Sequence, residues 1–217
     1  ARYERYNEVR QGRADTEPDI YFFNFGNYSG KFFVGEDGVN FYTIPQQKIM
    51  INSIREVVGG PIVRFVITTT DGVKYEFGKS SDNVRDGIEK NGTYSVCHNG
   101  NYQLSTELEE TITSSWYLVH IISPRGYTIT FDYDQNDYSF RTFGNETNYY
   151  KHITMSDTDS ECDNRFTYCY VRNHIYGKRL RRINFLHGKV EFDTKTTYRA
   201  DLTQDKALEY IRIYKIG

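Results

Sequence analysis

Four glycine turns, each between segments of alternating apolar and polar residues, constrain the fold more than any other feature of this sequence. In IISPRGYTITFDYD (121–134), every second residue after Gly126 is apolar, which is the period of a half-buried β-strand. The other three turns are Asp37-Gly38, Asp71-Gly72 and His187-Gly188. Glycine adopts the positive φ that tight hairpin turns need without strain, so each site predicts a β-hairpin, with positive φ at Gly72 and Gly126.

The apolar residues that follow these turns predict which face of each strand is buried. After Gly72 and Gly126 the apolar positions are Val73, Tyr75, Phe77, Tyr127, Ile129 and Phe131. We expect these side chains on the core face, and Thr128, Thr130 and Asp132 toward solvent or polar partners. After Gly188 the pattern is shifted by one residue. A one-residue shift reverses the faces of a strand, so this site predicts a different turn or a bulge.

The composition supports an all-β fold. Aromatic residues make up 16% of the chain, with 20 Tyr and 14 Phe, and such side chains fit pleated, half-buried surfaces. The spacing of the turn glycines is too irregular for a solenoid or a propeller. We therefore predict a single β-rich domain at residues 17–217, an antiparallel twisted sheet or sandwich built of β-hairpins. Residues 1–16 are expected to be an N-terminal extension or linker.

One or two short helices are expected in the insertions. STELEETITSSW carries a capping box at Thr106 and Glu109, which predicts a helix start. SSDNVRDGIEKNG is a polar loop with room for a short helical turn. The last segment, DLTQDKALEYIRIYKIG, favours a helical turn followed by a final strand with Ile211 and Ile213 on one face.

Charge and hydropathy narrow the classes of partner. The net charge is −2, which gives no reason to expect nucleic acid or an anionic membrane. No apolar segment approaches the roughly 18 residues of a transmembrane helix, so direct membrane insertion is not expected. Residues 1–13 lack the apolar core of a signal peptide, and a domain cut from a larger protein would show the same pattern.

The three cysteines are Cys97, Cys162 and Cys169. An odd number with irregular spacing does not make a disulfide framework. Two alternatives stay open at this point. Cys162 and Cys169 form a disulfide across a loop, or the cysteines are unpaired thiols without a chemical role.

Candidate ligand sites are few. Trp116, Tyr149 and Tyr150, the two tyrosines beside Asn145 and Asn148, are aromatic residues suited to stacking on sugar rings, with packing in a core as the alternative. The acidic segment 157–163 alternates Asp157, Asp159, Glu161 and Asp163, oxygen ligands of the kind calcium takes. It lacks the glycine and the final glutamate of an EF-hand, which favours a solvated loop and no metal site.

No residue pattern predicts an enzyme or a cofactor. His120 lies in the middle of a strand, where a structural role is expected, and Cys97 and His98 are adjacent and therefore point to opposite faces. Nucleophile-elbow, Walker and dinucleotide-binding glycine motifs are missing from the sequence. A hydrolase with paired carboxylates stays a third hypothesis, because sequence does not give the separation of two carboxylates.

Several segments together resemble a known family. EPDIYFFNFGNYSGKFF, DGVKYEFG, SSWYLVHIISPRGYTITFDYD and YRADL…LEYIRIY occur in this order between residues 17 and 217. They resemble the non-repetitive region that precedes the tandem repeats of large bacterial Rhs/YD-repeat proteins. Tyr133-Asp134 is not followed by the Gly-Arg of a standard repeat, and no self-cleaving Asp-Pro motif is present, so the chain matches neither the repeats nor a toxin payload.

The resemblance implies a non-catalytic scaffold domain of a secreted or surface-attached, extracytoplasmic protein. Its expected partners are the rest of the parent polypeptide and a cell-surface glycan or protein. A carbohydrate-binding module is the alternative interpretation, and it rests on the aromatic residues.

Overall fold

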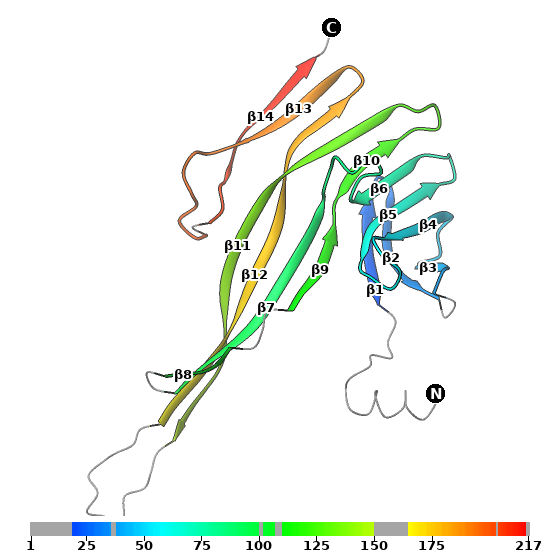
Figure 1. Ribbon diagram of the computed structural model, residues 1–217. Helices are drawn as coiled ribbons and strands as arrows, with labels where there is room; N and C mark the ends of the chain where they lie inside the picture. Colours follow the sequence, from blue (N-terminus) through cyan, green and yellow to red (C-terminus); the bar gives the residue numbers. More distant parts are fainter. Residues whose placement is uncertain are drawn as a thin grey trace, which may run out of the picture.

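The computed structural model describes residues 19–35, 38–99, 102–106, 110–149, 165–202 and 204–215, and these are all-β (Figure 1). Strands β1 (Ile20–Phe25), β2 (Tyr28–Val34) and β3 (Phe41–Ile44) form a three-stranded antiparallel sheet. The other eleven strands form a second antiparallel sheet: β4 (Ile49–Arg55), β5 (Ile62–Thr69), β6 (Lys74–Gly78), β7 (Ile88–Asn99), β8 (Tyr102–Thr106), β9 (Glu110–Trp116), β10 (Leu118–Ile122), β11 (Thr128–Tyr149), β12 (Arg165–Phe185), β13 (Gly188–Thr194) and β14 (Leu208–Lys215). The predicted extension, residues 1–16, lies outside the described residues.

All four predicted hairpins are confirmed, and they join β2 to β3, β5 to β6, β10 to β11 and β12 to β13. Gly72 and Gly126 have φ of 80° and 83°, which confirms the positive φ that their turns require. The turn before β13 is shifted, as the sequence pattern predicts. Phe185 pairs with Gly188, so the turn consists of residues 186 and 187, and Gly188 is the first residue of the strand.

The predicted helices are wrong for the described residues, which contain no helix and therefore none long and apolar enough to cross a membrane. Thr106 ends β8, where it pairs with Val96 of β7, and Glu110 begins β9, which pairs with the same strand. The hydrogen-bonding edge of β7 thus overrides the local capping signal. Glu109 lies outside the described residues, and the described parts of 81–86 and 201–207 are turns, bends and a bridge.

The core lies where the three-stranded sheet packs on β4, β5 and β6. Its buried members are Phe23, Phe25, Phe32, Ile51, Ile62, Phe65 and Ile67, with Tyr75, Phe77 and Trp116 among the half-buried residues packed against them. Phe65 is at the centre, because its ring meets those of Phe32 and Trp116 edge-on at centroid distances of 5.4 and 5.1 Å. Such aromatic pairs contribute beyond the burial of their area. The predicted core face of β6 is therefore confirmed at Tyr75 and Phe77.

The apolar face of the large sheet extends past this core. Directly paired residues of antiparallel strands share a face. A first row runs across β4, β5, β6, β10 and β11 as Ile51, Ile67, Tyr75, Ile121 and Ile129. Its first three members belong to the core or pack against it. A second row on the same face begins at Phe131, two residues after Ile129 on β11. It continues across β12, β13 and β14 as Ile183, Val190 and Ile213, and these four residues are here called the uncovered apolar row.

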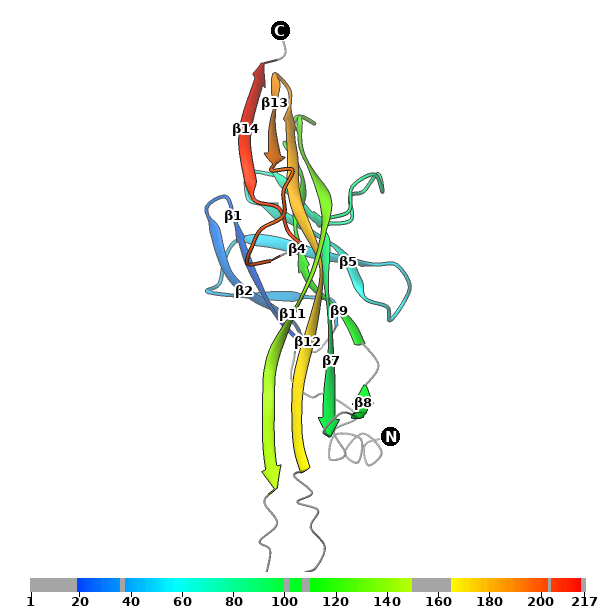
Figure 2. The same cartoon turned by 90° about the vertical axis from the view of Figure 1, so that its left-hand side faces the viewer.

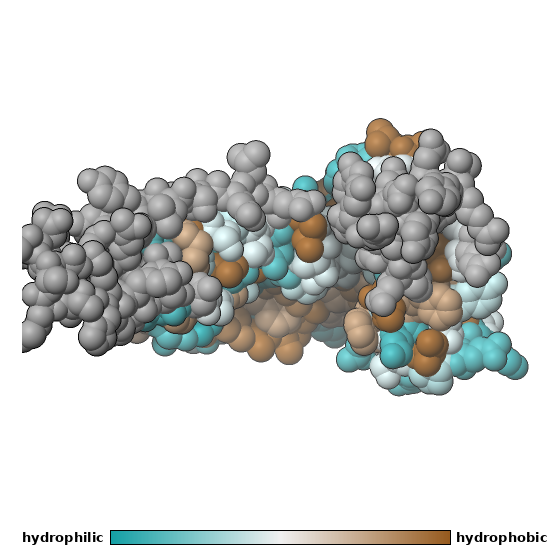
Figure 3. All heavy atoms as spheres, turned by 90° about the horizontal axis from the view of Figure 1, so that it is seen from below, coloured by the Kyte–Doolittle hydropathy of each residue, from teal (hydrophilic) through white to brown (hydrophobic). Residues whose placement is uncertain are grey.

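The three-stranded sheet does not reach the uncovered apolar row. None of the residues that pack against the core cluster belongs to β11–β14. Phe131 and Val190 are half-buried, and Ile213 is 77% exposed. Tyr127, which the alternation places on the core face, is 57% exposed, so that expectation is wrong. The sandwich is thus two layers thick at one end of the large sheet, where β1–β6 form the body of the molecule. Figure 3 shows hydrophobic side chains gathered between this body and the long arm of β11 and β12.

Strands β11 and β12 extend away from the body as a long arm, with β7 beside β12 (Figures 1 and 2). A disulfide joins Cys97 of β7 to Cys169 of β12, which are directly opposite each other in the ladder. Of the two alternatives that the sequence left open, neither holds for Cys169, because its partner is Cys97. Cys162 lies outside the described residues.

Candidate functional site

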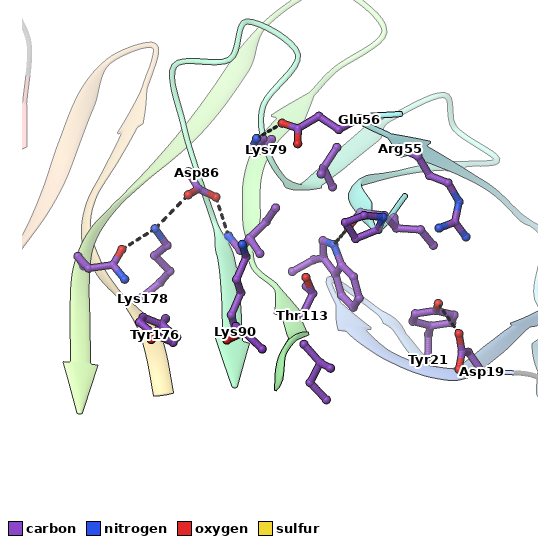
Figure 4. A pocket seen from close by; sticks show the side chains of 18 residues that line it. Asp19, Tyr21, Arg55, Glu56, Lys79, Asp86, Lys90, Thr113, Tyr176 and Lys178 are labelled. Atoms are coloured by element: carbon purple, nitrogen blue, oxygen red, sulfur yellow. Dashed lines mark hydrogen bonds and ion pairs between the residues drawn. The ribbon is translucent and has the colours of Figure 1, made fainter. Parts of the chain in front are cut away.

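An open cleft of about 1010 Å³ separates the body from the upper part of the arm (Figure 4). Its walls come from different strands: Tyr21 from β1, Arg55 from β4, Lys90 from β7, Trp116 from β9 and Lys178 from β12. The cleft exists because β9 pairs with β7 on the arm side, while its last residue packs into the core on the body side.

Trp116, the tryptophan singled out in the sequence, forms a fixed part of the cleft wall. Its indole N–H donates to the carbonyl of Ile62 at 2.9 Å. Its ring lies edge-on to Tyr21 at a centroid distance of 5.8 Å and also contacts Phe65. Trp116 is therefore both a packing residue and a lining residue, so the two interpretations of this position are not exclusive.

The carboxylates of the cleft are all engaged by neighbours. Glu56 pairs with Lys79, and Asp86 accepts from the Lys178 ammonium at 3.2 Å and from the Ile88 N–H at 3.0 Å. The Tyr21 hydroxyl donates to Asp19 at 3.4 Å. The hydrogen bond from Lys79 holds the pKa of the Glu56 carboxyl below its usual value. A glycoside hydrolase needs a carboxylic acid with a raised pKa, so Glu56 is not suited to that role.

A second polar site, here called the ionic cluster, lies on the face of the large sheet opposite the core and consists of Glu76, Arg85, His120, Asp132 and Asn184. His120 Nδ1–H donates to Glu76 Oε2 at 2.8 Å, and Glu76 also accepts from the N–H and the hydroxyl of Ser81. Both side chains are buried. The carboxylate fixes the tautomer of His120, which leaves Nε2 as an acceptor facing Arg85 Nη1 at 3.3 Å.

The ionic cluster fastens the loop at 79–87 to the sheet. Arg85 Nε donates to Asp132 at 2.8 Å, and Asn184 donates to the second oxygen of Asp132 at 3.0 Å. These contacts place Asp132 among polar partners, as the alternation predicts. The neighbours of His120 in the cluster include no nucleophilic side chain within hydrogen-bond reach of Nε2, only the guanidinium of Arg85. The contacts of both ring nitrogens, with Glu76 and Arg85, fit the structural role expected for His120.

Glu76→Gln is expected to lower the free energy of unfolding by about 2 kcal/mol. The hydrogen bonds from His120 and Ser81 all go to Glu76 Oε2, and hydrogen bonds to a charged group contribute about 1.5–3 kcal/mol, more than those to a neutral amide oxygen. Urea denaturation followed by fluorescence measures the difference. The matched control is Glu209→Gln on the exposed strand β14, which should change stability little. Equal stability of the two variants would show that the ionic cluster does not hold the loop.

The remaining residues singled out in the sequence are not brought to this cleft. Tyr149 ends β11 on the arm, where its backbone pairs with Arg165, and its side chain is outside the description. Tyr150 and the acidic segment 157–163 lie outside the described residues, and the described part of the chain holds no group of three or more candidate metal ligands. No sequence pattern joins Arg55, Lys90 and Lys178, because they come from three strands and share no sequence spacing.

Comparison of the chain with protein-family models, with curated proteins and with solved structures finds no match.

Proposed function

We propose that this chain is a non-catalytic structural domain of a larger extracytoplasmic protein of the Rhs/YD-repeat type. In this role, the uncovered apolar row packs against a further β-layer of the same polypeptide. The observation that carries the proposal is that one face of the large sheet is apolar from β4 to β14, while the three-stranded sheet covers it at one end alone.

The energetics favour a covering layer over the exposed end. Burial of apolar surface stabilises by roughly 25 cal/mol per Å², and extended apolar patches on soluble proteins mark interaction sites. On β14, Ile211 and Ile213 are 56% and 77% exposed, and every residue of the strand is exposed. β14 also ends the strand order of the large sheet, so it presents an open edge to which another strand can add.

Two further features agree with an extracytoplasmic scaffold. Disulfides form and persist mainly in oxidising compartments, and the bond between Cys97 and Cys169 links two neighbouring strands. The arm of β7, β11 and β12 carries that bond away from the body (Figure 2). A long paired arm suits a scaffold, because the ladder between β11 and β12 continues from the Thr130–Asn184 pair to the Tyr149–Arg165 pair.

Cysteine labelling tests the proposal, with Cys162→Ser as the background in both the isolated chain and the full-length parent. Val190→Cys places a thiol in the uncovered apolar row, and Lys189→Cys places one on the opposite face of the same strand. We expect Val190→Cys to react with maleimide in the isolated chain and to be protected about tenfold or more in the parent. Lys189→Cys should react in both. Equal labelling of Val190→Cys in the two proteins would contradict the packing role.

A further inference from the structure

The cleft beside Trp116 has an excess of positive charge on a chain whose net charge is −2. Its basic lining residues are Arg55, Lys79, Lys90 and Lys178, and its acidic ones are Asp19, Glu56 and Asp86. Lys79 and Lys178 neutralise Glu56 and Asp86 directly. These two ion pairs leave Arg55, Lys90 and Asp19 as the remaining charged lining residues, and Asp19 accepts a hydrogen bond from the neutral Tyr21 hydroxyl, so the lining has one positive charge in excess.

Arg55 and Lys90 stand on either side of the cleft (Figure 4). The Arg55 guanidinium donates to the carbonyl of Gly60, which holds its position and leaves its other N–H groups to a ligand. Within the described residues, no carboxylate forms an ion pair with Arg55 or Lys90. Cations of this kind form short, charge-assisted hydrogen bonds with carboxylate or sulfate oxygens.

The surface between these cations is aromatic and hydroxylated. Trp116, Tyr21 and Tyr176 contribute rings, and Thr111 and Thr113 contribute hydroxyl groups. Rings present an apolar face with a polar edge, and hydroxyl groups both donate and accept, which matches the alternating C–H and O–H surfaces of a sugar. At about 1010 Å³ the cleft is at the upper end of the range for ligand sites, and its open shape suits a polymer.

We infer that this cleft binds an acidic polysaccharide, with Arg55 and Lys90 on the carboxylate or sulfate groups and with Trp116 and Tyr21 against the sugar rings. The assignment does not depend on the structural role proposed above, because the uncovered apolar row lies on β11–β14 and contributes no residue to the cleft lining.

Surface plasmon resonance with immobilised polysaccharides tests the inference on the complete chain. Polygalacturonate presents carboxylates, and dextran sulfate presents sulfates. Neutral dextran is the uncharged comparison, and oligothymidylate is an anionic polymer without sugar hydroxyls of this kind. We expect at least one of the two acidic polysaccharides to bind about tenfold more tightly than dextran, and that ranking identifies the anionic group.

Two variants and one matched control assign the binding to the cleft. Lys90→Ala and Arg55→Ala should each weaken binding about tenfold, the effect of losing one charge-assisted contact. Lys74→Ala removes one exposed charge from β6 outside the cleft and should change binding less than about twofold. All three side chains are exposed, so thermal melting should confirm that each variant folds as the wild type does.

Three results would overturn the inference. The first is the failure of both acidic polysaccharides to bind more tightly than dextran. The second is an equal loss of affinity in Lys74→Ala, which would show general electrostatic attraction. The third is oligothymidylate binding as tight as that of the acidic polysaccharide, with the same response to Lys90→Ala, which would assign the cleft to nucleic acid.

Discussion

Phe65→Ala is expected to lower the free energy of unfolding by about 3–5 kcal/mol, the usual cost of removing a buried phenylalanine and leaving a cavity. Phe65 is 4% exposed and touches aromatic rings from both sheets, so the collapse of one neighbour cannot fill the space. Because total stabilities are about 5–15 kcal/mol, this single change should leave a marginally folded protein. Urea denaturation monitored by far-UV circular dichroism measures it.

Phe22→Ala is the matched control, because Phe22 is 81% exposed on β1 in the same body. Its effect should stay below about 0.5 kcal/mol, since a side chain already in water loses little on truncation. A Phe65→Ala variant as stable as Phe22→Ala would contradict the packing of the three-stranded sheet on β4–β6.

Removing the disulfide with Cys97→Ala and Cys169→Ala together should cost about 4 kcal/mol. The two cysteines are separated by 72 residues in the sequence, and the chain-entropy model gives about this value for a loop of that size. The loss should appear first in the arm, because the bond joins β7 to β12. Hydrogen exchange resolved by mass spectrometry should show faster exchange in these two strands than in β4 and β5.

Cys162→Ala is the control for the cysteine substitutions, and it should retain the bond between Cys97 and Cys169. Mass mapping of peptides without reduction confirms which pair is linked. An arm that exchanges at the same rate with and without the disulfide would show that the ladder of β11 and β12 alone holds it, and the estimate of about 4 kcal/mol would then be wrong.

Local sequence determined the four predicted hairpins and their turns. The alternation after Gly72 and Gly126 depends on neighbouring residues alone, and the positive φ at both glycines is a property of the turn itself, so all four hairpins were predictable. The one-residue shift at Gly188 was visible for the same reason. The polar face that carries Asp132 also followed from the two-residue period.

Long-range pairing decided what the local patterns could not. The capping signal at Thr106 favoured a helix, but the edge of β7 paired with that segment and made it a strand, because ladder hydrogen bonds outweigh a weak local preference. Cys97 and Cys169 became partners through the register between β7 and β12, which no cysteine spacing encodes. Tyr127 had the apolar period of a core residue and is exposed because it lies in the turn just before β11.

The sequence by itself thus determined that the chain is β-rich, where its tight turns lie and which residues alternate along each strand, since these depend on backbone sterics and on a period of two. Only the tertiary structure decided that the second layer covers β4–β6 and leaves Val190 and Ile213 uncovered. It also decided that Arg55, Lys90 and Trp116 share one cleft. The burial of a side chain, and the side chains that it meets in a cleft, depend on how the strands of the two sheets pair and pack. Residues far apart in sequence come together in this way, and no local sequence pattern marks them.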